Sequence, residues 1–245
     1  MTGSSAAASV MWPALLALVA SPAYAQSVWI AQGSVFYRDR AGHTRQLTHS
    51  RSDEGPVLAP NGNQVAFLRT VAGEKIRAAC GDVDPQEIRI MKVDGTYERR
   101  LVSSLRDPDH ASDRAALRDL KFSPTGQELF FMSQCAVVSG CLHKVDIRSR
   151  KTRMLSDCNG YEVLRCGRHK GDLLVVLHRY SEGGSYEEAW LMRANGLLVR
   201  DVGSGDGDEF QKTVRRFMAG DGCDSEAARP NRVLQPTPRE GAAER

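Results

Sequence analysis

One short element occurs twice in this chain and limits the folds that it can adopt. The stretch VLAPNGNQVAF, residues 57–67, has Pro60 and Gly62 where LKFSPTGQELFF, residues 120–131, has Pro124 and Gly126. In both copies proline and glycine mark a turn between two short apolar runs. A degraded third copy, in residues 168–178, keeps a glycine but has lost the proline. Recurrence of one element is the sequence signature of a repeat fold.

A second element alternates with the first: a strand, a turn, and a strand that ends in a Leu-Thr-like pair. Its two most similar copies carry Asp94-Gly95 and Asn195-Gly196 at the same place, and such dipeptides supply the positive φ angles of a type I′ hairpin turn. Alternation of apolar and polar residues along these segments favours strands over helices. The four copies span residues 35–48, 88–102, 143–156 and 189–202.

Together the two elements give four strands per repeat at a spacing of roughly 45 to 65 residues, which is typical of β-propeller blades with some long loops. We therefore predict an all-β fold over residues 26–204, a small or partial β-propeller of about four blades. Three blades would be complete, and the last hairpin would join the N-terminal strand in a fourth. An open partial ring, or a ring completed by a second copy of the chain, are the alternatives.

The repeat resembles that of the TolB-type, WD-like β-propellers. The matching residues are Pro60, Gly62, Val65, Ala66 and Phe67, followed by Met91, Asp94, Gly95, Arg99 and Leu101. The resemblance extends over about residues 28–203 and implies a propeller scaffold in a cell-envelope setting. TolB-like proteins also carry an N-terminal α/β domain and usually six blades, and this chain has room for neither.

The two ends of the chain differ from the repeats. Residues 1–25 are interpreted as a signal peptide, because the apolar run of residues 11–20 is shorter than the roughly 20 residues that span a bilayer and Ala23-Tyr24-Ala25 forms an A-x-A cleavage site before Gln26. No Lys or Arg precedes the run, so a buried N-terminal helix or a start codon placed too early are alternatives. The product is predicted to be periplasmic or secreted and not membrane-spanning.

The C-terminal end is predicted to form a helix and then a disordered tail. Phe210, Val214, Phe217 and Met218 fall on one face of a helix over residues 205–219. We expect this helix to pack on the propeller and cover an exposed sheet surface; a partner-binding helix is the alternative. Residues 220–245 are polar and lack periodicity, which indicates disorder.

Six cysteines in an exported chain favour disulfides. Cys158 and Cys166 bracket a hairpin-like bend, and Cys135 and Cys141 bracket a loop of five residues. By elimination, Cys80 would pair with Cys223 and tie the tail to a loop.

Other patterns argue against several functional classes. The sequence contains no G-x-S-x-G nucleophile elbow and no C-x-x-C pair, and its six histidines are dispersed. We therefore predict no catalytic residue, no metal site and no cofactor. The net charge of +3, with acidic and basic residues interspersed, gives no basis for nucleic-acid binding.

Binding is expected at the loops that connect strands. Loops 71–86, 134–141 and 180–187 follow the Pro-x-Gly strands and would emerge at one rim, while the loops after the Leu-Thr-like strands would emerge at the other. The first rim carries Arg77, Tyr180 and Tyr186 as candidate anchors. We thus predict an exported, non-enzymatic propeller that binds another macromolecule, an envelope or periplasmic protein; self-assembly stays open. The alternative is a small-ligand or carbohydrate-binding propeller, a degenerate enzyme accessory domain.

Overall fold

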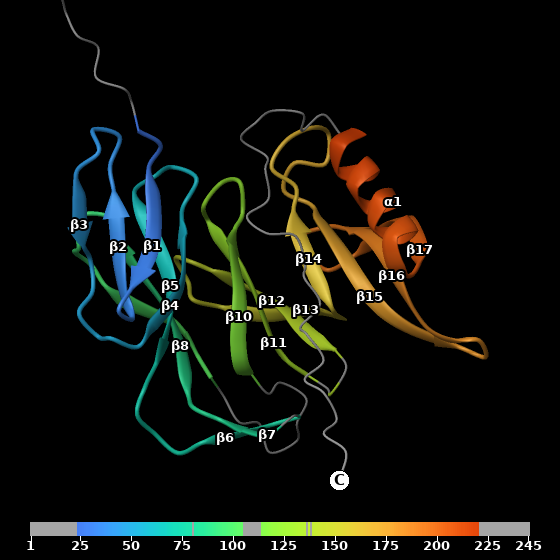
Figure 1. The fold of residues 1–245 in the computed structure, drawn as a ribbon, viewed down its shortest axis with the longest axis horizontal. Helices are drawn as coiled ribbons and strands as arrows, with labels where there is room; N and C mark the ends of the chain where they lie inside the picture. Colours follow the sequence, from blue (N-terminus) through green and yellow to red (C-terminus); the bar gives the residue numbers. More distant parts are fainter. Residues whose placement is uncertain (1–23, 80, 105–113, 136, 138, 221–245) are drawn as a thin grey trace, which may run out of the picture.

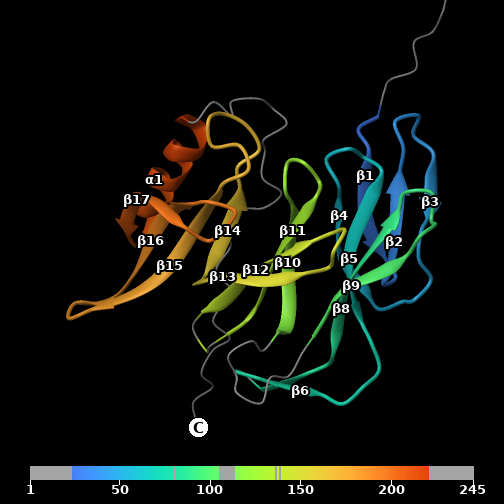
Figure 2. The same cartoon turned by 180° about the vertical axis from the view of Figure 1, so that it is seen from behind.

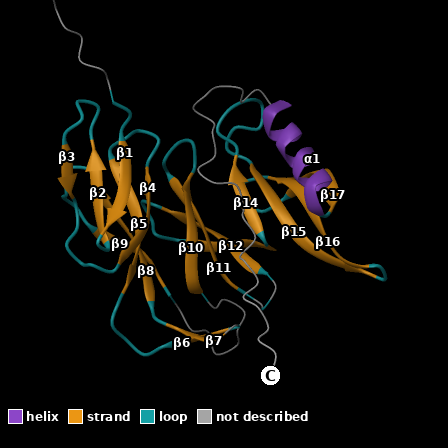
Figure 3. Cartoon of the chain, viewed as in Figure 1, coloured by secondary structure: helices purple, strands orange, loops and turns teal. Residues whose placement is uncertain are grey.

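A computed structural model describes residues 24–79, 81–104, 114–135, 137 and 139–220 of the chain. This part consists of short strands, the turns between them and one helix, as Figure 3 shows. None of its helices is long and apolar enough to span a membrane.

Four sheets of three or four antiparallel strands follow one another along the described part of the chain. We number them as blades. Blade 1 contains β1 (Ser27–Ala31), β2 (Ser34–Arg38) and β3 (Thr44–Gln46). Blade 2 contains β4 (Asp53–Leu58), β5 (Gln64–Thr70), β8 (Gln86–Lys92) and β9 (Arg99–Ser103). Blade 3 contains β10 (Ala115–Phe122), β11 (Glu128–Gln134), β12 (Gly140–Asp146) and β13 (Thr152–Cys158). Blade 4 contains β14 (Gly160–Val163), β15 (Leu173–Ser181), β16 (Gly184–Met192) and β17 (Leu198–Gly205).

Between the second and third strands of blade 2, the chain forms a separate hairpin of β6 (Ile76–Ala78) and β7 (Gly81–Val83).

Sheets of this kind, placed side by side, are the blades of a β-propeller, so the predicted fold class is confirmed. Three blades have four strands and blade 1 has three. The four blades form an open row, with blade 1 at one end and blade 4 at the other (Figures 1 and 2). The expectation that the last hairpin joins the N-terminal strand is wrong: β16 and β17 pair within blade 4, and β1 pairs with β2.

Three apolar layers of the core lie between neighbouring blades, and a fourth lies between blade 4 and the C-terminal helix. Phe67 of β5 packs against blade 1, whereas its neighbours Ala66 and Leu68 pack against blade 3. In the same way, Phe131 of β11 faces blade 2 and Phe130 faces blade 4. Since successive side chains of a strand point to opposite faces, the inner strands of the row are apolar on both faces.

The Pro-x-Gly turns have the same structure in blades 2 and 3. The Gly62 amide donates to the Ala59 carbonyl at 2.8 Å, and the Gly126 amide donates to that of Ser123 at 2.9 Å. Their φ angles are +71° and +70°. Proline at the second position and glycine at the fourth are typical of type I turns.

The Asp-Gly and Asn-Gly turns differ from the prediction. Only the glycines have positive φ, +89° at Gly95 and +91° at Gly196, and the amides of these glycines donate to the carbonyls of Lys92 and Arg193. This is a type I turn followed by a left-handed glycine, so the predicted type I′ turn is wrong. The Asp94 carboxylate stabilises the turn by accepting from the Thr96 amide at 2.8 Å.

The helix α1 (Gly207–Gly220) covers the outer face of blade 4. Phe210 is 3% exposed and packs with Leu174 and Val176 of β15, and with Ala189 and Leu191 of β16. The other apolar residues of the helix, Val214, Phe217 and Met218, are partly buried against the same layer. The packing role expected for this helix is confirmed.

Phe210→Ala should destabilise the fold by about 3–5 kcal/mol, because it leaves a cavity where the helix meets blade 4. Urea unfolding monitored by circular dichroism measures this change. Lys212→Ala is the control; its side chain is 64% exposed, and such substitutions usually change stability by no more than about 0.5 kcal/mol. Equal effects of the two substitutions would show that the helix does not pack as described.

Candidate functional site

The strand connections divide the row of blades into two faces. In an antiparallel blade the second and fourth strands run in the same direction, so the connections after both leave at one face. The amide of Gln86, the first residue of β8, donates to the hydroxyl of Ser104, just after β9, at 3.0 Å. The Gln86 side chain accepts from the amide of Leu117 in β10 at 2.8 Å. The loops that follow the Pro-x-Gly strands and the loops that follow the Leu-Thr-like strands therefore leave at the same face. The expectation that they lie at opposite rims is wrong.

We call this side of the row the hairpin face, because the β6–β7 and β15–β16 hairpins project from it. The opposite side, where the Pro-x-Gly turns and the turns between third and fourth strands lie, is the turn face. Both hairpins connect the second strand of a blade to the third. Figure 1 shows both at the same side of the row, in blade 2 and blade 4.

Arg77 lies at the centre of β6, and its side chain is 79% exposed. Its Nε is 3.9 Å from the Asp82 carboxylate across the hairpin, and that carboxylate is also exposed. Surface ion pairs of this kind contribute little to stability. The Arg77 guanidinium is thus accessible to another molecule.

Tyr180 and Tyr186 lie on the β15–β16 hairpin but on opposite faces of it. Tyr180 pairs with Ser185, whereas Tyr186 pairs with Arg179, one register position away. Tyr180 is 68% exposed. Its ring lies edge-on to that of His178, with the ring centroids 4.8 Å apart. On the other side, Arg179 donates to Glu188 at 3.0 Å. The structure therefore places Arg77, Tyr180 and Tyr186 on one face of the row without bringing them into one cluster.

The cysteines follow the prediction only in part. Cys135 and Cys141 form the expected disulfide, with their Cα atoms 5.3 Å apart. The predicted Cys158–Cys166 bond is wrong: Cys158 is a free thiol, 1% exposed at the end of β13. Cys166 is disulfide-bonded, but its partner lies outside the described residues. The predicted Cys80–Cys223 bond also lies outside them.

The burial of Cys158 explains why spacing failed to predict its state. Its side chain enters the apolar layer between blades 3 and 4, among Phe130, Leu142 and Tyr161. Burial in this layer raises the pKa of the Cys158 thiol to about 12. A thiol of this kind behaves as a small apolar side chain.

We predict that Cys158 of the native protein does not react with iodoacetamide at pH 8 and reacts fully once the chain is unfolded in guanidinium. Mass spectrometry of non-reduced tryptic peptides should recover Cys135 linked to Cys141. A peptide joining Cys158 to Cys166 would contradict the structure.

A network of ion pairs on blade 2 had no clear signal in the sequence. Arg69 of β5 binds Asp53 of β4 through two bonds of 2.6 and 3.0 Å, and the Asp53 side chain is fully buried. Arg69 and Arg89 both donate to Glu98. The bonds to Asp53 raise the pKa of Arg69 despite its partial burial. Cross-strand pairing aligns these residues, and pairing of this kind depends on register, which a single sequence does not show.

A second buried polar contact lies between blades 2 and 3. The Ser133 hydroxyl and Nε2 of His143 are 2.8 Å apart, and both residues are almost fully buried. The imidazole stacks on Phe131, with ring centroids 5.0 Å apart. Burial, followed by the positive charge of Arg114, lowers the pKa of His143 from 6.5 to about 4.

Because of this pKa shift, we expect the free energy of unfolding to fall at acid pH. Between pH 6.5 and 4 the unfolded chain binds a proton at His143 that the folded chain does not, so this contribution is complete above pH 6.5 and is lost as the pH falls toward 4. A pKa shift of this size corresponds to about 3 kcal/mol in the free energy of unfolding. Urea unfolding of the wild type and of His143→Gln at a series of pH values isolates this contribution, since the variant lacks it.

The control for this measurement is His178→Gln, which leaves His143 intact and should retain the wild-type pH dependence. A wild-type protein and a His143→Gln variant with the same slope between pH 6.5 and 4 would contradict the burial of a neutral imidazole.

Within the part of the chain that the structure describes, no three His, Cys, Asp or Glu side chains are grouped so that they could hold a metal ion.

Comparisons with known proteins give structural likeness alone. The chain matches no protein-family model, and its sequence matches no curated protein. It is similar to dipeptidyl peptidase 4 of Porphyromonas gingivalis, with 13% identity and a TM-score of 0.51 over 75% of this chain and 31% of that one. The β-propeller domain of the Trilobed protease from Pyrococcus furiosus, described as an open velcro topology, has 10% identity and a TM-score of 0.48 over 71% and 49%.

TolB from Acinetobacter baumannii has 14% identity and a TM-score of 0.45 over 69% of this chain and 37% of its own. The chain thus spans less than half the length of each of these three proteins. Sequence identities this low show that the proteins share a fold and nothing more. The fold of this chain is that of a β-propeller.

Proposed function

We propose that this protein is an exported, non-enzymatic propeller that binds another macromolecule of the cell envelope through its hairpin face. The observation that carries this proposal is the projection of the β15–β16 hairpin. Pairing of β15 with β16 continues to Ser181 and Gly184. In contrast, β14 pairs with β15 only as far as Val176, and β17 pairs with β16 only as far as Glu187. The end of the hairpin therefore extends beyond the blade as a two-stranded ribbon.

The side chains of this ribbon suit contact with a partner. Tyr180 exposes most of its ring, and Tyr186 and Arg179 lie together on the other side. Tyr and Arg are enriched in the residues that dominate binding energy, because each combines apolar area with directional hydrogen bonds. A rigid sheet fixes the base of the ribbon, so little conformational entropy is lost when the tip is bound.

The distribution of these groups favours a macromolecule over a small ligand. Arg77 and Tyr180 project from the same face but from different blades, with blade 3 between them (Figure 1). A partner that contacts both must extend across blade 3. The Cys135–Cys141 disulfide constrains the loop of blade 3 at this same face.

Export is supported by the A-x-A site before Gln26 and by the disulfides, which persist in oxidising compartments. The absence of a nucleophile elbow from the sequence supports a non-enzymatic role. Cleavage before Gln26 would remove Tyr24, whose amide donates to the Arg40 carbonyl at 3.0 Å.

The test is cross-linking of the periplasmic protein in intact cells, followed by purification and mass spectrometry. We expect the wild type to capture a discrete envelope protein, and Tyr180→Ala with Tyr186→Ala to reduce this capture at least about tenfold, the effect of losing roughly 1.4 kcal/mol of binding energy. Arg77→Ala should weaken it as well.

The matched control is Tyr97→Ala on the turn face, where the tyrosine is 75% exposed. This variant should capture the partner normally. Loss of capture in Tyr97→Ala, with normal capture by the Tyr180 and Tyr186 variant, would show that the opposite face binds.

A further inference from the structure

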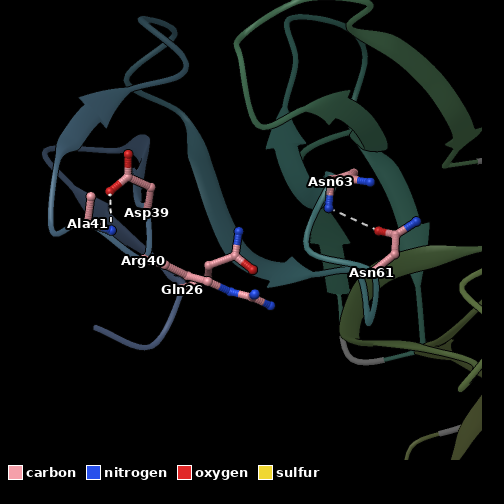
Figure 4. Close-up of a pocket in the computed structure, with 6 residues that line it drawn as sticks. All are labelled: Gln26, Asp39, Arg40, Ala41, Asn61 and Asn63. Carbon is pink, nitrogen blue, oxygen red and sulfur yellow. Dashed lines mark hydrogen bonds between the residues drawn. The ribbon is translucent and has the colours of Figure 1, made fainter. Parts of the chain in front are cut away.

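A depression lies at the seam between blades 1 and 2, on the turn face. Three separate segments line it: the residue before β1, the β2–β3 turn and the β4–β5 turn (Figure 4). Its volume is about 430 Å³, within the range of roughly 300–1,000 Å³ that is typical of ligand pockets. The lining residues are Gln26, Asp39, Arg40, Ala41, Asn61 and Asn63.

The turns that form the depression are held by their own hydrogen bonds. Asp39 Oδ1 accepts from the amides of Ala41 and His43, both at 2.9 Å. Asn61 Oδ1 accepts from the Asn63 amide at 3.0 Å. Gln26 Nε2 donates to the Tyr37 hydroxyl at 2.6 Å. These bonds fix the side chains before any ligand arrives, which lowers the entropy cost of binding.

Other atoms of the same side chains are unused. Gln26 Oε1, the Asn61 and Asn63 side-chain NH₂ groups and the Arg40 guanidinium form no side-chain hydrogen bond or ion pair within the described residues. Figure 4 shows Gln26 and Arg40 reaching from blade 1 toward the turn that carries Asn61. The depression therefore offers several hydrogen-bond donors and at least one acceptor.

The charge and polarity of the lining select one class of ligand. The Arg40 and Asp39 side chains are adjacent and opposite in charge, so the side chains of the lining together carry no net charge that would select an anion or a cation. Ala41 is its single apolar residue, so an apolar ligand would leave the amides unpaired at a cost. Hydroxyl groups donate and accept at once and match these groups. We infer that the depression binds one unit of a neutral saccharide.

Side-chain amides make this inference directly testable, because their NH₂ groups give separate signals in ¹H–¹⁵N NMR spectra. Titration of the ¹⁵N-labelled protein with glucose or N-acetylglucosamine should shift the signals of Gln26, Asn61 and Asn63 in a saturable way. Asn61→Asp keeps the oxygen that holds the turn but removes both amide donors, and should weaken binding at least about tenfold, the size of the loss of one to two good hydrogen bonds.

Asn195→Asp is the matched control, since Asn195 of blade 4 accepts from the Leu197 amide in the same way and lies away from the depression. It should bind as the wild type does. Absence of saturable shifts with both sugars, equal affinity of Asn61→Asp and wild type, or tighter binding of glucuronate than of glucose would each overturn the inference. Since Tyr180 and Tyr186 lie on the other face, their substitution leaves this titration unchanged, which separates it from the proposed function.

Discussion

A blade that is apolar on both faces must be covered on both sides, and the rest of this structure depends on that constraint. Blade 3 is covered by blades 2 and 4, which bury Phe131 on one side and Phe130 on the other. Burial of such side chains contributes roughly 1.5–3 kcal/mol each. In a closed ring every blade has two neighbours. In an open row the two outermost blades each lack one, and this chain treats its two ends differently.

At the C-terminal end, α1 takes the place of a fifth blade. Phe210 fills the position over β15 and β16 that a neighbouring sheet would fill. At the N-terminal end, blade 1 has only three strands, so less surface needs cover. Its outward side chains Trp29 and Phe36 stack on each other, with ring centroids 5.7 Å apart, and each covers part of its neighbour. The hairpin face and the turn face carry the connections between strands, and the two proposed binding sites lie there.

The repeat was readable from the sequence because local chemistry determines it. Pro60 with Gly62 and Pro124 with Gly126 set the same turn wherever they stand, and alternation along the strands sets which side chains are buried. Features that depend on distant residues were not readable. Cys158 and Cys166 are close in sequence, yet one is buried between blades and the other is bonded elsewhere. Likewise, the ion pairs of Arg69 and the depression around Asn61 arise only when the register and the packing of two blades are known.

The four blades form an open row that ends at α1. Double electron–electron resonance tests this arrangement, because it measures the distance between two spin labels. The labels are placed at equivalent exposed turns of the turn face: Ala41, Tyr97, Ser149 and Leu197 of blades 1 to 4. The distance from the label at Ala41 should be shortest to Tyr97, longer to Ser149 and longest to Leu197. In a closed ring of four blades, Leu197 would instead be as near to Ala41 as Tyr97 is, and that result would contradict an open row.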